Sequence, residues 1–161
     1  MSSKQVNTKT IARIAAIQTL YQYHLSGYEL NIDELVQNMI KHYQNGELHD
    51  DFELTAEHIK MKLSNVYFTS LVQCTIEHLG KLDSIILTHL DKKGGLDSLS
   101  ILLLAILRIG ICELKFFPEV PKKVVINEFT DITNDMLSGN EVSFVNSVLD
   151  NISKGSENVI H

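Results

Sequence analysis

The sequence predicts an all-α fold, a single-domain bundle of about seven helices with residues 99–115 at its centre. Apolar residues recur at spacings of three and four in every long segment, as in a helix with one buried face. The chain has only two prolines, at positions 118 and 121, and signals for β-hairpin turns are scarce. A chain of 161 residues can bury roughly 70% of its unfolded surface, so it needs no disulfide or metal to fold.

The composition also limits the classes of function. Cys74 and Cys112 are the only cysteines and form no CxxC pair, which favours a reduced, cytoplasmic compartment. No signal peptide is visible. The longest apolar run, Ile101 to Leu107, is far shorter than the ~20 residues of a membrane span, so no membrane is predicted.

Charge is unevenly distributed along the chain. The net charge of −6 argues against a nucleic-acid partner. However, residues 1–28 contain three cations and no acid, whereas residues 29–60 are strongly acidic. Two interpretations stay open: a cationic N-terminal end with a function, or the ordinary variation of charge along a soluble chain. The three cations are Lys4, Lys9 and Arg13.

The first helix is expected at Thr8–Leu25, after an arm of residues 1–7 and before the Ser26-Gly27 stop. One face is read as the buried one and the other as partly cationic and aromatic. That second face either packs against neighbouring helices or binds a single-stranded nucleic acid. The expected buried face is Ile11, Ile14, Ile17, Gln18, Tyr21 and Leu25, and the other face is Lys9, Arg13, Ala16, Leu20 and Tyr23.

Three further helical segments are expected before the central one. They are Leu30–Tyr43, a long region 53–80 with a break near Ser64-Asn65, and Leu82–Leu90. Residues 99–115 are apolar nearly all round, which predicts a buried central helix. Arg108 and Glu113 interrupt it, and both are expected to be structural groups that are paired or reach an edge.

Two helices are expected to close the chain. Pro121 suits a first helical position, and the apolar residues Val125, Phe129, Ile132 and Met136 follow at helical spacing. Residues 138–140 end this helix, and Asn140 is predicted to cap the next one. Its buried stripe is Val142, Val145, Leu149 and Ile152. Phe144 lies at the margin of that stripe, where it is either the edge of the core or a platform for an unpaired base.

No catalytic or cofactor motif is present. The chain has no P-loop, no dinucleotide-binding glycine pattern, no GxSxG and no HExxH. The cluster His49-Asp50-Asp51 has no second His or Cys at ligand spacing, so no metal site is predicted. Neither an enzyme nor a cofactor-binding protein is expected.

Several ordered blocks resemble one family. They are Ala16–Tyr21 (AIQTLY), Leu107–Leu114 (LRIGICEL), Val120-Pro121, Val125-x-Asn127-Glu128, Phe144-Val145-Asn146 and Val148-Leu149-Asp150. Their letters and order are similar to those of the NusB family of transcription antitermination factors. The resemblance covers nearly the whole chain, except residues 29–63.

The resemblance implies two packed helical subdomains and a role in regulating bacterial ribosomal RNA synthesis. Such proteins bind single-stranded boxA RNA in ribosomal RNA leaders together with the small-subunit ribosomal protein NusE, and so suppress premature termination. Other elongation factors and RNA polymerase are then indirect partners, and a homodimer stays open. The RNA-binding residues expected by this likeness are Lys4, Lys9, Arg13, Asn140 and Phe144.

Residues 9–13 read KTIAR where the family often has an arginine run. Fewer cations imply weak RNA binding without a partner. Two alternatives stay open: a helical protein–protein interaction module with incidental or no RNA binding, and the RNA-binding domain of an RNA methyltransferase, which would need a further domain.

Overall fold

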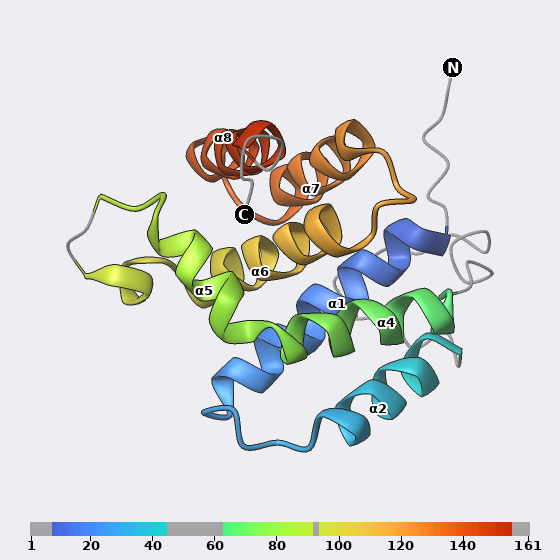
Figure 1. Ribbon diagram of the computed structural model, residues 1–161. Helices are drawn as coiled ribbons and strands as arrows, with labels where there is room; N and C mark the ends of the chain where they lie inside the picture. The colour runs from blue at the N-terminus through green and yellow to red at the C-terminus, as the bar shows by residue number, and fades with distance from the viewer. Residues whose placement is uncertain (1–7, 45–62, 92–93, 156–161) are drawn as a thin grey trace. The chain divides into compact units, whose positions relative to one another are not determined.

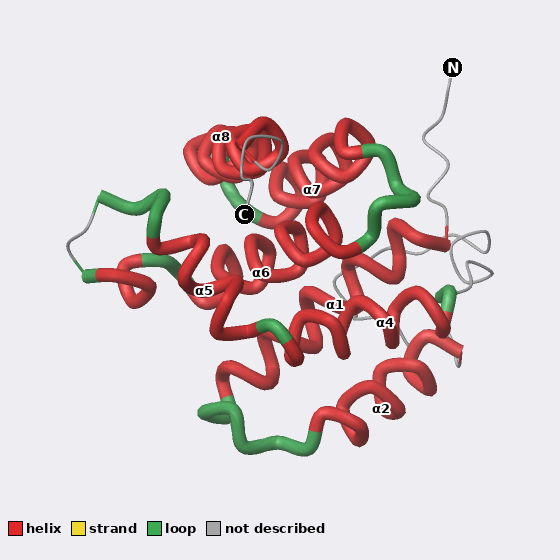
Figure 2. Tube along the Cα trace, in the orientation of Figure 1, coloured by secondary structure: helices red, strands yellow, loops and turns green. Residues whose placement is uncertain are grey.

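The structure is a computed structural model that describes residues 8–44, 63–91 and 94–155 (Figure 1). Within these residues the secondary structure is helical throughout and contains no strand (Figure 2). The predicted all-α class is therefore confirmed. The helices are α1 (Thr8–Leu25), α2 (Ile32–Gln44), α4 (Asn65–Glu77), α5 (Leu79–Leu87), the 3-10 helix η1 (Gly95–Ser98), α6 (Ile101–Phe116), α7 (Lys122–Met136) and α8 (Gly139–Gly155).

Contacts group the chain into two compact units, Met1–Val72 (unit 1) and Gln73–His161 (unit 2). Helix α4 begins in unit 1 and ends in unit 2. The grouping agrees with the two subdomains that the resemblance implies, and a single domain for the whole chain stays a prediction. The predicted arm at residues 1–7 and nearly all of the predicted tail at residues 155–161 lie outside the described residues.

Unit 1 is built on the pair of α1 and α2. The C=O of Tyr23 accepts from the N–H of Tyr28 at 2.9 Å, and Gly27 has a φ of 75°, so α1 ends in a left-handed turn. Asn31 then caps α2, because its Oδ1 accepts from the Glu34 N–H at 3.0 Å. Val36 and Met39 are the buried residues of α2.

The buried face of α1 differs from the predicted one. Tyr21 and Leu25, expected inside, are 36% and 57% exposed, whereas Arg13 and Leu20, expected outside, are buried. The buried face is centred on Ile17 together with the alanines of α1. The predicted face was chosen from the spacing of large apolar residues, whereas the observed buried face consists mainly of alanines. The buried alanines are Ala12, Ala15 and Ala16.

Unit 2 is built around α6, as predicted. Every residue from Leu103 to Leu114 is buried, and α5, α7 and α8 all pack on this helix. Gly110 permits the close approach, because a Cβ there would lie 3.3 Å from Cγ of Phe129 on α7 and 3.6 Å from Cδ1 of Leu149 on α8. The Ser100 hydroxyl caps α6 by accepting from the Leu103 N–H at 3.1 Å.

Arg108 has the structural role predicted for it. Its Nε and Nη2 atoms donate to Oδ1 and Oδ2 of Asp83 at 2.8 and 2.9 Å, in a two-pronged pair that ties α6 to α5. Arg108 is 3% exposed and Asp83 is 23% exposed, so the charges are held largely away from water. Glu113, the other charged residue predicted to be structural, is fully buried.

The predicted cap of the last helix was wrong. α8 begins at Gly139, so Asn140 lies in its first turn and Ser138 is the capping residue. The Ser138 N–H and hydroxyl both donate to Oε1 of Glu141, the N–H at 3.2 Å. The bond from the Ser138 N–H is the half of a capping box in which the Glu side chain reaches back to the backbone of the capping residue, as the Ser-x-x-Glu spacing favours. Pro121, expected as the first helical residue, instead stands just before α7.

Candidate nucleic-acid interface

Two of the predicted RNA-binding residues meet around an aromatic ring in unit 1. Lys9 and Arg13 are one turn apart on α1, and both approach Tyr67 in the first turns of α4. The Lys9 Nζ lies 5.0 Å from the centre of the Tyr67 ring, and the Arg13 Cζ lies 5.8 Å from it. Both distances are within the range of cation–π attraction. We call these three residues the Tyr67 cluster.

The members of the Tyr67 cluster differ in exposure. Lys9 is exposed and Tyr67 is half-buried. Arg13 is 2% exposed, so the prediction that it lies on an outward face was wrong. The buried Arg13 guanidinium therefore lies against Tyr67 inside unit 1, whereas the Lys9 side chain is open to solvent. Lys4, the third predicted cation, lies outside the described residues.

Tyr67 is a candidate that the sequence did not reveal. Its segment was expected to be helical, but no spacing within it indicated that this ring would meet two cations from α1. A contact between residues nearly sixty positions apart is a property of the fold, and a single sequence gives no signal for it.

The other two predicted RNA-binding residues lie on α8 in unit 2. Asn140 is exposed in the first turn, and Phe144 follows one turn later on the same side, half-buried. Glu141 lies between them, and its hydrogen bond from the Ser138 hydroxyl lowers the pKa of its carboxyl group. The first turn of α8 is therefore anionic at neutral pH, which suits contact with a base better than contact with a phosphate.

Each pair thus belongs to its own unit. The structure brings Lys9 and Arg13 together around Tyr67, and it places Asn140 and Phe144 on one helix face. The cation–aromatic combination in unit 1 and the polar–aromatic combination in unit 2 are both suited to an unpaired nucleic acid strand.

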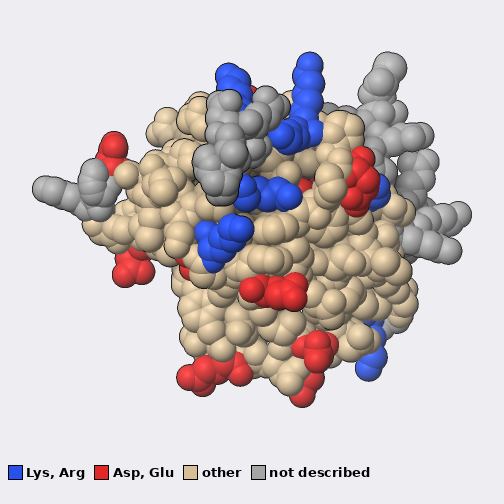
Figure 3. Space-filling view, viewed as in Figure 1, with Lys and Arg blue, Asp and Glu red and all other residues tan. Residues whose placement is uncertain are grey.

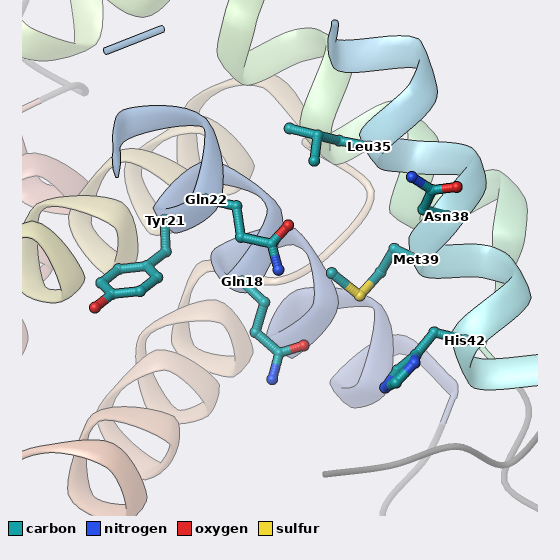
Figure 4. Close-up of a pocket in the computed structure, with 7 residues that line it drawn as sticks. All are labelled: Gln18, Tyr21, Gln22, Leu35, Asn38, Met39 and His42. Atoms are coloured by element: carbon teal, nitrogen blue, oxygen red, sulfur yellow. The ribbon is translucent and has the colours of Figure 1, made fainter. Parts of the chain in front are cut away.

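A groove of about 480 Å³ opens between α1 and α2 in unit 1 (Figure 4). In Figure 4, Met39 extends from α2 toward Gln18 and Gln22 on α1. The Tyr43 hydroxyl donates to Oε1 of Gln18 at 3.0 Å and so orients this amide, and burial raises the pKa of Tyr43 to about 12. The groove can accept a neutral group that forms hydrogen bonds. It is lined by Gln18, Tyr21, Gln22, Leu35, Asn38, Met39 and His42.

Within the described ranges, no three His, Cys, Asp or Glu side chains come together in a way that could hold a metal ion. The cluster His49-Asp50-Asp51 lies outside those ranges. No helix among the described residues is both long enough and apolar enough to cross a membrane.

The chain is similar in sequence to known proteins over nearly its whole length. The profile of the NusB family matches residues 10–154. The "Transcription antitermination protein NusB" of Rickettsia bellii is 47% identical over 152 residues, which cover 94% of each chain. The protein of the same name from Rickettsia massiliae is 47% identical over 154 residues, or 96% of each chain.

The fold is similar to solved structures as well. One is a crystal structure of the antitermination factors NusB and NusE in complex with dsRNA, with a TM-score of 0.72 and 26% identity, covering 92% of this chain and 97% of that one. Another is the solution structure of NusB from Aquifex aeolicus, with a TM-score of 0.67 and 25% identity over 91% and 88% of the two chains. Sequence and fold agree, and this chain belongs to the NusB family.

Proposed function

We propose that this chain is a transcription antitermination factor that binds boxA-type single-stranded RNA in ribosomal RNA leaders. It does so together with the small-subunit ribosomal protein NusE and suppresses premature termination. The observation that carries the proposal for this chain's own residues is the Tyr67 cluster, where two cations meet an aromatic ring. The name of the Rickettsia relatives and the relative crystallised with NusE and RNA support it.

The residues divide the work of binding between charge and stacking. Lys9 neutralises a phosphate, and each such contact on a single strand contributes about 0.7 to the slope of log affinity against log salt. Arg13 acts through Tyr67, since its buried guanidinium lies 5.8 Å from the centre of that ring. Phe144 offers a ring on which one unpaired base can stack, worth about 1–3 kcal/mol, and Asn140 can form hydrogen bonds beside it.

This footprint is small for a chain of net charge −6. Affinity for a strand comes largely from phosphate neutralisation, so the chain alone binds weakly. NusE supplies the missing contacts. When it holds one part of the strand, the contact with this chain becomes intramolecular, at an effective concentration in the millimolar range for short spans.

The remaining features follow from the same role. The protein is regulatory and performs no catalysis, and it works in the bacterial cytoplasm where RNA polymerase and the other elongation factors are its indirect partners. It folds as a single domain and uses no cofactor. A homodimer stays open.

The test is a fluorescence titration of labelled boxA-type RNA with this chain, with NusE and with both. Cooperative binding to the pair, much tighter than to either protein alone, supports the proposal. Because one solved relative holds dsRNA, a duplex of the same sequence is titrated in parallel. Preference for the duplex would overturn the single-strand assignment.

The second candidate is a helical module that contacts proteins, with incidental or no RNA binding. The groove between α1 and α2 favours it, because Tyr21 at its lining and Leu25, Tyr28 and Leu30 nearby in the chain are all exposed. In the same titration this candidate predicts binding to NusE without any gain in RNA affinity. The two functions therefore give different results in one experiment.

A further inference from the structure

The lysines of the α7–α8 hairpin in unit 2 are confined to one end of it. Residues 124–153 contain no lysine or arginine, although several acids lie within this range. The cations stand at its borders, with Lys122 and Lys123 in the first turn of α7 and Lys154 in the last turn of α8. The acids are Glu128, Asp131, Asp135, Glu141 and Asp150.

The cationic ends of the two helices lie together. The Lys122 Nζ donates to the carbonyl oxygen of Ser153 at 3.5 Å, which places the start of α7 against the end of α8. Lys115 stands in the last turn of α6, only a short loop before α7 begins. Three helices of unit 2 therefore present lysines at the same end.

An aromatic pair continues this surface toward α5. The Phe116 ring, which directly follows Lys115, stacks on His78 with ring centres 4.1 Å apart and planes inclined by 19°. The His78 Nδ1–H donates to the Cys74 carbonyl oxygen at 2.9 Å, which fixes the imidazole ring. On α5, the Lys81 Nζ lies 5.8 Å from the centre of the Phe116 ring.

We propose that this surface, the lysine face, binds the phosphates of the same single-stranded RNA, as a second contact separate from the residues assigned above. The inference rests on the proposed function. Figure 3 shows Lys and Arg side chains gathered over α5, α6, α7 and α8. The lysine face consists of Lys81, Lys115, Lys122, Lys123 and Lys154.

The acids near the lysine face do not neutralise it. Glu77 and Glu119 are exposed and lie within four residues of Lys81 and Lys115 in the sequence, and Asp150 pairs with Lys154 at 3.0 Å. The side chains of this pair are 45% and 73% exposed, so the ion pair is weak and a phosphate can replace the carboxylate at little cost. The surface holds more lysines than carboxylates, so its net charge is positive.

The lysine face complements the candidate site at the other end of the hairpin. Asn140 and Phe144 lie at the acidic end, where Glu141 and Asp135 disfavour a phosphate. The 15 residues of α7 separate the two ends by about 22 Å. A strand with one base stacked on Phe144 can therefore place its phosphates on the lysine face only several nucleotides away, and a short RNA would miss this contact.

The test compares charge-removing and charge-keeping variants of the full chain together with NusE. The probe is a labelled single-stranded RNA of about 20 nucleotides with a boxA-type element, longer than the ~4–16 nucleotides that one small binding domain covers. Lys81→Gln/Lys115→Gln/Lys123→Gln should lower the log–log salt slope by about 2, three contacts at ~0.7 each. The triple Lys→Arg variant at the same positions should keep the wild-type slope.

A matched pair of single variants controls for net charge. Lys123 and Lys41 are both exposed, but Lys41 lies on α2 in unit 1. Lys123→Gln should lower the slope by ~0.7, and Lys41→Gln should leave it unchanged. Circular dichroism on each variant confirms that the helices are intact.

Three results would overturn the inference. If the wild-type pair binds RNA and the triple Gln variant keeps its slope, the lysine face is not a contact while the proposed function stands. If only affinity for NusE falls, the surface docks protein. If the wild-type chain binds no RNA with or without NusE, the proposed function fails, and the lysine face fails with it.

Discussion

The packing at Gly110 predicts that Gly110→Ala destabilises unit 2. In a helix interior, Ala is favoured over Gly by about 1 kcal/mol. At this position the added Cβ would lie 3.3 Å from Cγ of Phe129, closer than ordinary contact. Phe129 is completely buried, so its ring cannot move out of the way. Overpacking of this kind costs about 1–3 kcal/mol, and the net loss should reach up to ~2 kcal/mol.

Gly80 offers a matched control on α5, since a Cβ there would meet nothing within 4 Å. Gly80→Ala should leave stability unchanged or raise it by up to ~1 kcal/mol. Urea unfolding gives the free energy of each variant from the midpoint and slope. Gly110→Ala should lower the free energy of unfolding by less in a Phe129→Leu background than in the wild-type chain, because the smaller side chain leaves room for the added Cβ. A stabilising Gly110→Ala, equal in effect to Gly80→Ala, would refute the packing argument.

Four further predictions test other parts of the structure. Asp83→Ala removes the carboxylate that pairs with the buried Arg108 guanidinium and should cost about 3 kcal/mol in urea unfolding. The double variant Asp83→Leu/Arg108→Leu should cost less than Asp83→Ala. Ser138→Ala should cost about 1 kcal/mol, because it removes the hydroxyl that donates to Glu141 at the start of α8. The Ser138 hydrogen bond lowers the folded-state pKa of Glu141, so its contribution is present above the unfolded pKa and is lost as pH falls through the folded pKa; pH-dependent unfolding of Glu141→Gln should lack this loss. Arg13→Ala should reduce stability as well as RNA affinity, because Arg13 is buried, whereas Lys9→Ala should reduce RNA affinity alone.

The sequence predicted the fold well where periodicity was carried by large apolar residues. It placed α1 at its observed bounds and the central helix within two residues of α6. It also found the buried stripes of α7 and α8, except that Met136 and Val142, at the ends of those stripes, are only half-buried. Helix bounds and buried stripes depend on the spacing of apolar residues along the chain, which a single sequence contains. The resemblance to the NusB family was confirmed by the family profile.

The errors have physical causes that differ from one position to another. Arg13 was expected outside because a cation opposite a stripe usually meets water, but α1 buries small alanines on that side and the guanidinium with them. Asn140 is a good cap by residue type, yet Ser138 precedes it, and the Glu141 carboxylate accepts from the Ser138 N–H, which favours a helix start at Gly139. Tyr67 and the lysine face depend on contacts between distant segments, and periodicity carries no information about those.

The central claim is that the Tyr67 cluster binds RNA, and one titration tests it most directly. Labelled boxA-type RNA is titrated with NusE and either Lys9→Ala or Lys41→Ala, two exposed lysines on different helices of unit 1. We expect Lys9→Ala to lower the RNA affinity and to lower the log–log salt slope by ~0.7. Lys41→Ala should leave both the affinity and the slope unchanged. Equal affinity and equal slope for the two variants would contradict the account.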